Sequence, residues 1–249
     1  MKHITFLILL FIGFNVLKAE TYKVETGQFD KIKVNGNISV VYKNLTDSTG
    51  MACYDAPVGS SRMFDIEVNK NGLLKVSPGD DNWSAENLPT LYVYSDFLTS
   101  VESYSDQEVQ VASLAPCATF KLSLIGNGTI YAEGIRSTSV SASISTGNGS
   151  IYLSGKCDKA NFRMVGTGLI SADRLQALDV KCNILGTGSI GCWPVDNLNV
   201  SGLGSTKIYY KGTPHISKKG GGKLFELPSN NSEGQGTEVR SFNPSREEE

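Results

Sequence analysis

Residues suited to catalysis are few in this sequence and widely separated. The only histidines are His3 and His215, and no G-x-S-x-G motif accompanies them, so nothing indicates an α/β-hydrolase triad. No Cys or His pair has the spacing of zinc ligands. Glu133 and Asp173 share one phase of a glycine repeat, two units apart, which predicts a separation of about 9.6 Å. That is the outer limit for an inverting glycosidase. We therefore expect no catalytic residue, no metal site and no cofactor, with a polysaccharide-active enzyme as the least favoured function.

Tyrosines offer a better candidate for function, namely binding. Tyr131 and Tyr152 each stand five residues after the first glycine of consecutive repeat units, and Tyr209 joins them if its unit is shifted by two residues. Tyrosines stacked on an outer face form a platform for a sugar face or a partner side chain. An ordinary cross-strand ladder that shields the backbone gives the same pattern. Tyr131, Tyr152 and Tyr209 are the candidate ligand-binding residues.

A glycine repeat defines the elements that must position these tyrosines. Gly-x-Gly recurs six times at intervals of 16 to 21 residues, and stretches of alternating apolar residues surround the turns. It falls at 126–128, 147–149, 166–168, 186–188, 202–204 and 220–222. Alternation with period two marks a strand buried on one face. Each unit is therefore predicted to be strand, glycine turn, strand. A phosphate loop is excluded, because G-x-G-x-x-G must open a helix and β-type sequence follows every turn here.

Each unit places three inward clusters in about 20 residues, which predicts one rung of a solenoid. The predicted ladder after the turns is Ile130, Ile151, Ile170, Ile190 and Ile208. A third inward position is predicted at Ile135, Cys157, Leu175 and Val195. In the second unit the strand before the turn sits one residue early, which predicts a bulge. The fold class is all-β, a right-handed parallel β-helix with Gly-x-Gly turns. An antiparallel sandwich is the alternative.

The chain outside the repeat divides into three further parts. Residues 116–226 are expected to form the solenoid repeats. Residues 20–115 are expected to form an irregular β portion that either packs on the solenoid or continues it, with loops at 44–62 and 77–89. Asn71-Gly72 is a two-residue hairpin signal. Residues 227–249 form a polar tail that we expect to be flexible.

The first 19 residues read as a secretory signal. An apolar run from Ile4 to Leu17 is shorter than the roughly 20 residues of a spanning helix, and cleavage is predicted after Ala19. An uncleaved anchor is the alternative. Cleavage removes Lys2 and Lys18, leaving 21 basic against 25 acidic residues. This balance and the absence of a basic stripe argue against nucleic acid as a partner. No other run is long enough to span a membrane.

Five cysteines cannot all pair within one chain. Cys117 and Cys157 share a phase but lie two rungs apart, beyond the roughly 7 Å between Cα atoms that a disulfide tolerates. Cys182 and Cys192 fall in apolar ladders on opposite sides of one turn. We expect these four to be mostly buried free thiols that pack as small hydrophobic residues. Cys53 is expected in an irregular loop.

The pattern as a whole resembles a known family, the secreted bacterial "putative auto-transporter adhesin, head GIN domain" proteins. The resemblance spans residues 27–226. It rests on FDKIKVNGNISV, NGLLKVSPG, LYVYSDFLTSVESYSD and the repeated GNGTI, GNGSI and GTGSI turns. One departure is SYSDQEV at 103–109, where family members tend to have another glycine–serine turn, so this rung is expected to be distorted. The resemblance implies a β-helical protein of the periplasm or cell surface of a Gram-negative bacterium, and it implies no catalytic residues.

Two functions follow from these expectations. The first is a non-catalytic, adhesin-like binding protein whose partner is a glycan or another protein of the cell envelope. The alternative is a structural module that associates through the ends of its solenoid, either with copies of itself or with another β-solenoid, because open end rungs invite pairing.

Overall fold

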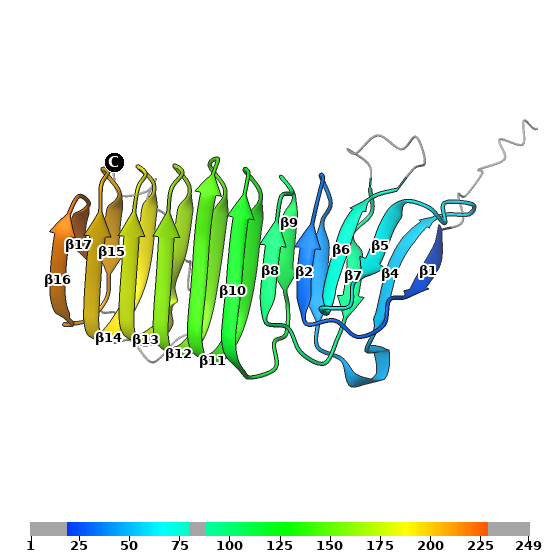
Figure 1. The fold of residues 1–249 in the computed structure, drawn as a ribbon, viewed down its shortest axis with the longest axis horizontal. Coiled ribbons are helices and arrows are strands. Elements are labelled where there is room, and N and C mark those ends of the chain that lie inside the picture. The colour runs from blue at the N-terminus through cyan, green and yellow to red at the C-terminus, as the bar shows by residue number, and fades with distance from the viewer. Residues whose placement is uncertain (1–18, 80–87, 229–249) are drawn as a thin grey trace, which may run out of the picture.

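The computed structural model describes residues 19–79 and 88–228. The predicted signal sequence up to residue 18 and nearly all of the predicted tail lie outside these ranges. Within them the regular secondary structure is all β-strand, apart from one short 3₁₀ turn, η1 (Thr46–Ser48). The strands stack into a right-handed parallel solenoid, as the repeat predicts (Figure 1).

The solenoid has two faces, joined along one edge by the glycine turns and along the other by a bend. The first face contains, from the C-terminal end, β17 (Lys223–Glu226), β15 (Lys207–Tyr210), the first parts of β14 (Ser189–Gly202), β13 (Leu169–Ile184), β12 (Ser150–Met164) and β11 (Thr129–Thr146), then β9 (Glu108–Val111), β3 (Val40–Lys43), β7 (Leu91–Tyr94), β4 (Met51–Pro57) and β1 (Ala19–Glu25).

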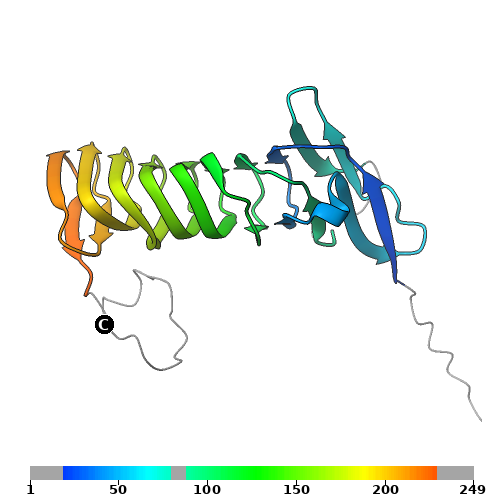
Figure 2. The same cartoon turned by 90° about the horizontal axis from the view of Figure 1, so that it is seen from below.

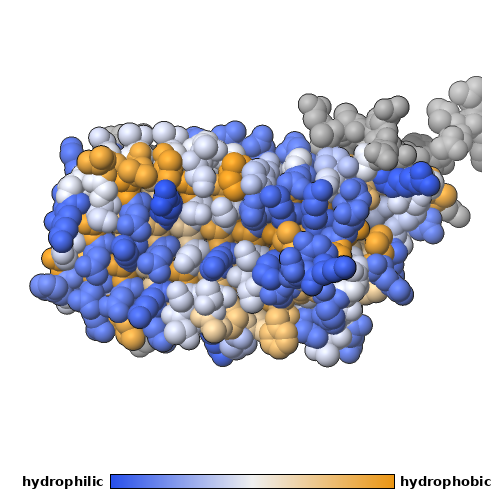
Figure 3. All heavy atoms as spheres, viewed as in Figure 1, coloured by the Kyte–Doolittle hydropathy of each residue, from blue (hydrophilic) through white to orange (hydrophobic). Residues whose placement is uncertain are grey.

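The second face is turned toward the viewer in Figure 1. It contains, in the same direction, β16 (His215–Gly220), the last parts of β14, β13, β12 and β11, then β10 (Cys117–Ile125), β8 (Ser100–Ser103), β2 (Lys31–Val34), β6 (Leu73–Pro78) and β5 (Phe64–Val68). Strands β11 to β14 therefore run around the bend and belong to both faces. Figure 3 shows mainly polar side chains over this face, with apolar residues gathered along the turn edge, where Leu185 and Leu203 are exposed.

The isoleucine ladder is confirmed. Ile130, Ile151, Ile170, Ile190 and Ile208 stand opposite one another on successive rungs, and each is fully buried. Like side chains stacked at about 4.8 Å bury a continuous apolar core that no single rung could bury alone. The bulge predicted in the second unit is also present, because Leu124 and Ile125 pair with Ile144 and Thr146 and so leave Ser145 unpaired.

The third inward position was predicted with the wrong members. Ile135, Cys157 and Leu175 are all buried, but Gly155 rather than Cys157 stands between Ile135 and Leu175 in register. Val195 is 41% exposed. The cause is a set of register shifts at the bend, between Ala132 and Ile135 and again between Tyr152 and Ser154, which counting from the glycines does not reveal.

Glycine is needed in the turns chiefly because the rungs approach each other closely. A Cβ at Gly168 would overlap the carbonyl oxygen of Gly149 on the preceding rung, and the φ of Gly168 lies outside the left-handed region. Only some of the turn glycines have the left-handed conformation, such as Gly147 with φ 82°. The requirement at Gly168 is thus for space rather than for an unusual dihedral angle.

Side chains at the turn tips form a ladder of their own. The backbone N–H of Asn127 donates to Oδ1 of Asp106 (3.0 Å), and that of Asn148 donates to Oδ1 of Asn127 (3.1 Å). Asp106 lies in the segment 103–109 where a distorted rung was expected. Instead, β8 and β9 pair in regular parallel register with β10 and β11, and Asp106 takes the place of the turn-tip asparagine.

The N-terminal strands enter the stack out of sequence order. The rung made by β2 and β3 lies between the rung of β6 and β7 and the rung of β8 and β9. β4 then pairs antiparallel with β1 and β7, and β5 pairs antiparallel with β6, at the same end of the molecule. Antiparallel strands thus cover the N-terminal end of the parallel stack.

Two expectations for this region need correction. Cys53 lies in strand β4, not in an irregular loop, and much of the loop expected at 44–62 is this strand. The hairpin between β5 and β6 is present, but the Gly72 N–H bonds the carbonyl of Asn69, so Lys70 and Asn71 are its central residues. Gly72 follows with φ 71°, a position that suits glycine.

Candidate ligand-binding face

The predicted tyrosine residues lie in one outward column of the first face. In register, this column is Gln110, Tyr131, Tyr152, Ser171, Gly191, Tyr209 and Phe225. The two-residue shift considered for the unit of Tyr209 is therefore the one the fold adopts. The column contains two aromatic pairs separated by two small residues.

Tyr131 and Tyr152 form the first pair. Their ring centroids are 4.8 Å apart and their planes are inclined by 9°, so the rings stack almost parallel along the solenoid axis. Both side chains are half-buried. Partial burial raises the pKa of Tyr131, and Tyr152 and Glu108 add to the effect. The pair thus presents a stacked aromatic surface to the solvent.

Polar side chains lie next to this surface. A small hollow of about 20 Å³ beside Tyr152 is lined by Glu133, Ser154, Ser171 and Arg174 among others. Arg174 stands opposite Ser154 in register. Sequence reasoning missed Arg174, because the bulge after Tyr152 moves it out of the phase it would have by counting. A carboxylate, a guanidinium and hydroxyls beside aromatic rings are groups that bind sugar hydroxyls.

Tyr209 is placed differently from the other two tyrosines. Its ring stacks on Phe225 with centroids 5.1 Å apart, and only 4% of its surface is exposed. Phe225 itself is 40% exposed. The column therefore offers Tyr131, Tyr152 and Phe225 as aromatic surface, and Tyr209 contributes mainly by supporting Phe225.

The carboxylates considered for catalysis have different environments. Asp173 is buried, accepts a hydrogen bond from Ser171 Oγ (3.0 Å) and forms an ion pair with Lys211 Nζ (3.1 Å). Lys211 also donates to the Asp173 carbonyl and lies 5.8 Å from the centre of the Trp193 ring. Glu133 is exposed. Lys211 reaches Asp173 from two rungs away, so the repeat phase of Asp173 gave no sign of this partner.

The remaining candidates for chemistry are isolated. His215 is exposed on β16 in the terminal rung. Within residues 19–79 and 88–228, no group of three or more His, Cys, Asp or Glu side chains is arranged to hold a metal ion.

All five cysteines are free thiols, as expected for four of them. Cys157, Cys182 and Cys192 are buried, whereas Cys53 and Cys117 are half-exposed. Ser137 stands between Cys117 and Cys157 in register, which confirms their two-rung separation. Burial, with a smaller contribution from Asp158, raises the pKa of the Cys157 thiol to about 12.

The fold and this face define a class of protein: a parallel β-solenoid with a rigid aromatic strip on its surface. Residues 28–214 match the profile of the family described as "Putative auto-transporter adhesin, head GIN domain". The match covers most of the chain, and the chain belongs to this family. A search of curated proteins gives no match.

Solved structures share the fold. A putative adhesin from Bacteroides fragilis NCTC 9343 is 21% identical with a TM-score of 0.74, over 84% of this chain and 97% of that one. A putative adhesin from Parabacteroides merdae ATCC 43184 is 21% identical with a TM-score of 0.68, over 85% and 97%. A putative lipid binding protein from Parabacteroides distasonis ATCC 8503 is 21% identical with a TM-score of 0.66, over 84% and 97%. At these identities the likeness shows the fold alone.

Across the described ranges, the chain has no helix with the length and apolar character needed to cross a membrane.

Proposed function

We propose that this protein is a non-catalytic, adhesin-like binding protein that works outside the cytoplasm, in the periplasm or at the cell surface. Its partner is an extended molecule, a glycan or a peptide, which lies along the first face over Tyr131 and Tyr152. The observation that carries the proposal is the parallel stack of these two rings at 4.8 Å. Rigid aromatic surface costs little conformational entropy to present, so it makes a good anchor.

Three further features support binding without turnover. The hollow beside Tyr152 supplies hydrogen-bonding groups next to the rings. Asp173, which is buried, is engaged by Lys211 and Ser171 and so is poorly placed to act as a general acid or base. Membership of an adhesin family and the predicted signal sequence agree with a location in the envelope.

The test is a double variant, Tyr131→Ala with Tyr152→Ala, compared with the unchanged protein on arrays of glycans and of peptides. We expect binders of the unchanged protein to lose at least tenfold in affinity, because both rings of the anchor are removed. Tyr104→Ala is the matched control, since Tyr104 is an exposed tyrosine outside the column. Circular dichroism checks that both variants keep the fold. Binders that the double variant holds as tightly as the unchanged protein would show that the tyrosine face is the wrong site.

A further inference from the structure

A groove follows the bend edge of the solenoid, apart from the tyrosine column. Its floor is one column of small residues on successive rungs: Cys117, Ser137, Cys157, Ala177 and Pro194. At about 4.8 Å per rung, this floor is roughly 19 Å long. One hollow of about 390 Å³ opens over its C-terminal part, and a second of about 360 Å³, which shares Arg136, Ser137 and Asp158 with it, opens toward Cys117.

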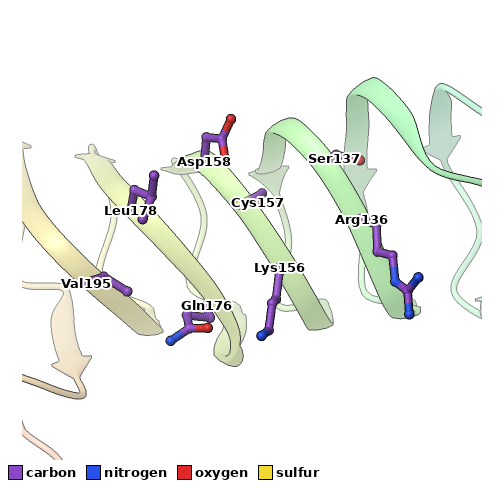
Figure 4. Close-up of a pocket in the computed structure, with 8 residues that line it drawn as sticks. All are labelled: Arg136, Ser137, Lys156, Cys157, Asp158, Gln176, Leu178 and Val195. Atoms are coloured by element: carbon purple, nitrogen blue, oxygen red, sulfur yellow. The ribbon is translucent and has the colours of Figure 1, made fainter.

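Longer side chains form the two rims of this bend groove. Figure 4 shows Arg136, Lys156 and Gln176 pointing to one side of the floor, while Asp158 and Leu178 lie on the other. Figure 2 shows the molecule from below, with the bend edge turned toward the viewer. Small floor residues between long rim residues explain why the edge is hollowed here.

The first rim carries two positive charges. Arg136 and Lys156 stand directly opposite each other on neighbouring rungs, where like charges repel. Among the described residues neither forms an ion pair with a carboxylate. Gln176 and then Trp193 continue the same column. The rim therefore places two cations, an amide and an indole in a line along the solenoid axis.

We propose that this groove binds a linear acidic polysaccharide, with the carboxylate groups of neighbouring sugars on Arg136 and Lys156. A bound anion would offset the repulsion between the two side chains. Gln176, Ser137 and the Asp158 carboxylate on the opposite rim supply partners for sugar hydroxyls. The Arg136 guanidinium suits a carboxylate in particular, because its planar donors match two carboxylate oxygens at once.

A polysaccharide fits this groove better than other anionic partners. The strands of the groove already pair their backbone groups with neighbouring rungs, so an extended peptide crossing them would find few backbone partners. The exposed apolar surface at Leu178 and Val195 is small for an acyl chain. Two cations with a carboxylate opposite are also too few for the multiple phosphate contacts of nucleic acid.

The test uses purified protein and two galacturonan oligomers of equal length, one with free carboxylates and one fully methyl-esterified, measured by titration calorimetry. We expect the acidic oligomer to bind and the ester not to bind. Arg136→Gln with Lys156→Gln should weaken binding of the acidic oligomer at least tenfold. Higher salt should weaken binding to the unchanged protein, because the contacts are ionic. The matched control is Lys121→Gln with Lys181→Gln, which removes the same charge from the outer surface of the second face.

Three results would overturn the proposal: no binding of the acidic oligomer, equal binding of the ester, or equal loss in the groove and control variants. A hexaglutamate peptide that binds the groove as tightly as the acidic oligomer would overturn the choice of a polysaccharide. Tyr131→Ala with Tyr152→Ala distinguishes this groove from the tyrosine face. Loss of acidic-oligomer binding in that variant, with retention in the groove variant, would assign the ligand to the tyrosine face instead.

Discussion

The interaction between Asp173 and Lys211 shows how one side chain can tie several rungs together. Lys211 extends from its own rung past Trp193 and reaches the Asp173 carboxylate on a rung further on. The Asp173 side chain is 7% exposed and that of Lys211 is 29% exposed. A carboxylate so deeply buried needs its partners, because burying a charge without them is costly.

Lys211→Met should therefore destabilise the protein. Methionine keeps much of the contact with Trp193 but leaves the Asp173 carboxylate without its cation, at a cost of about 1–3 kcal/mol. The measurement is the free energy of unfolding in urea. Lys223→Met is the control, because it removes an exposed lysine from β17. Equal stability of the two variants would show that the ion pair contributes nothing.

Thiol reactivity should follow burial. Cys157 has a pKa raised to about 12 from 9.0 by burial, so at pH 8 it carries roughly a thousandfold less reactive thiolate than an unperturbed thiol. The Cys182 side chain and burial raise the pKa of Cys192 as well. In the native protein, iodoacetamide should modify Cys53 and Cys117 first and Cys157, which is 8% exposed, far more slowly, whereas Cys182 and Cys192 should react only after unfolding. Mass spectrometry of the labelled protein checks this order.

Raising the pH adds a second check. Because the raised pKa keeps Cys157 protonated, its labelling should keep accelerating above pH 9, where an ordinary thiol is already mostly ionised. Two intramolecular disulfides in the purified protein would contradict the assignment of free thiols.

At the scale of elements, the isoleucine ladder is the feature on which the stack depends. Ile170 lies in the middle of this ladder, between Ile151 and Ile190. Replacing it with Asp would bury an unpaired charge and should cost several kcal/mol or unfold the protein. Thermal unfolding followed by circular dichroism measures the effect. Lys181→Asp, at an exposed position of the same strand, should change the melting temperature little; a soluble Ile170→Asp variant with an unchanged melting temperature would reject the ladder.

Elements with a regular period were predictable, and those with register shifts were not. The alternation around Ile170 and the spacing of the Gly-x-Gly turns predicted the rungs and the alignment of Tyr131 with Tyr152, because both depend on residues close in sequence. Val195 was misjudged and Arg174 was missed, because bulges at the bend shift the phase and no residue type marks these bulges. The Asp173–Lys211 ion pair was missed, because it joins side chains whose rungs are not neighbours.

The order of the N-terminal rungs could not be predicted from the sequence either. The sequences of β3 (Val40–Lys43) and β7 (Leu91–Tyr94) do not indicate which strand lies next to β9, because both are short strands with the same alternation of buried and half-buried residues. The choice is made by long-range pairing, which places β3 between β7 and β9. Strands far apart in sequence thereby close the N-terminal end of the solenoid, and antiparallel β1, β4 and β5 cover it.

At the scale of the whole molecule, the two ends of the solenoid differ. Among the described residues, β16 pairs only with β14, and β17 only with β15, so the C-terminal rung offers backbone groups for further pairing. Its side chains oppose such pairing. The buried column Phe162, Cys182 and Val200 continues to Lys218, which stands in an inward position of the last described rung and is exposed.

An inward-pointing charge on an edge strand is a known protection against edge-to-edge association. Another rung stacked on β16 would bury the Lys218 ammonium beside Val200 without a partner. Lys218 therefore disfavours the assembly alternative, in which solenoids join through their ends. We expect the unchanged protein not to associate through this end.

Lys218→Val should remove the obstacle. Valine extends the apolar column to the end of the stack and leaves the unpaired backbone of β16 next to apolar surface, so the variant should self-associate as its concentration rises. Light scattering over a hundredfold range of concentration measures this. Lys219→Val is the control, because Lys219 stands in the neighbouring outward column opposite Ser201 and should leave the mass unchanged. The unchanged protein could instead form larger species itself, with Lys218→Val causing no further increase in mass. That result would show that Lys218 does not prevent association through this end, and it would favour the assembly alternative.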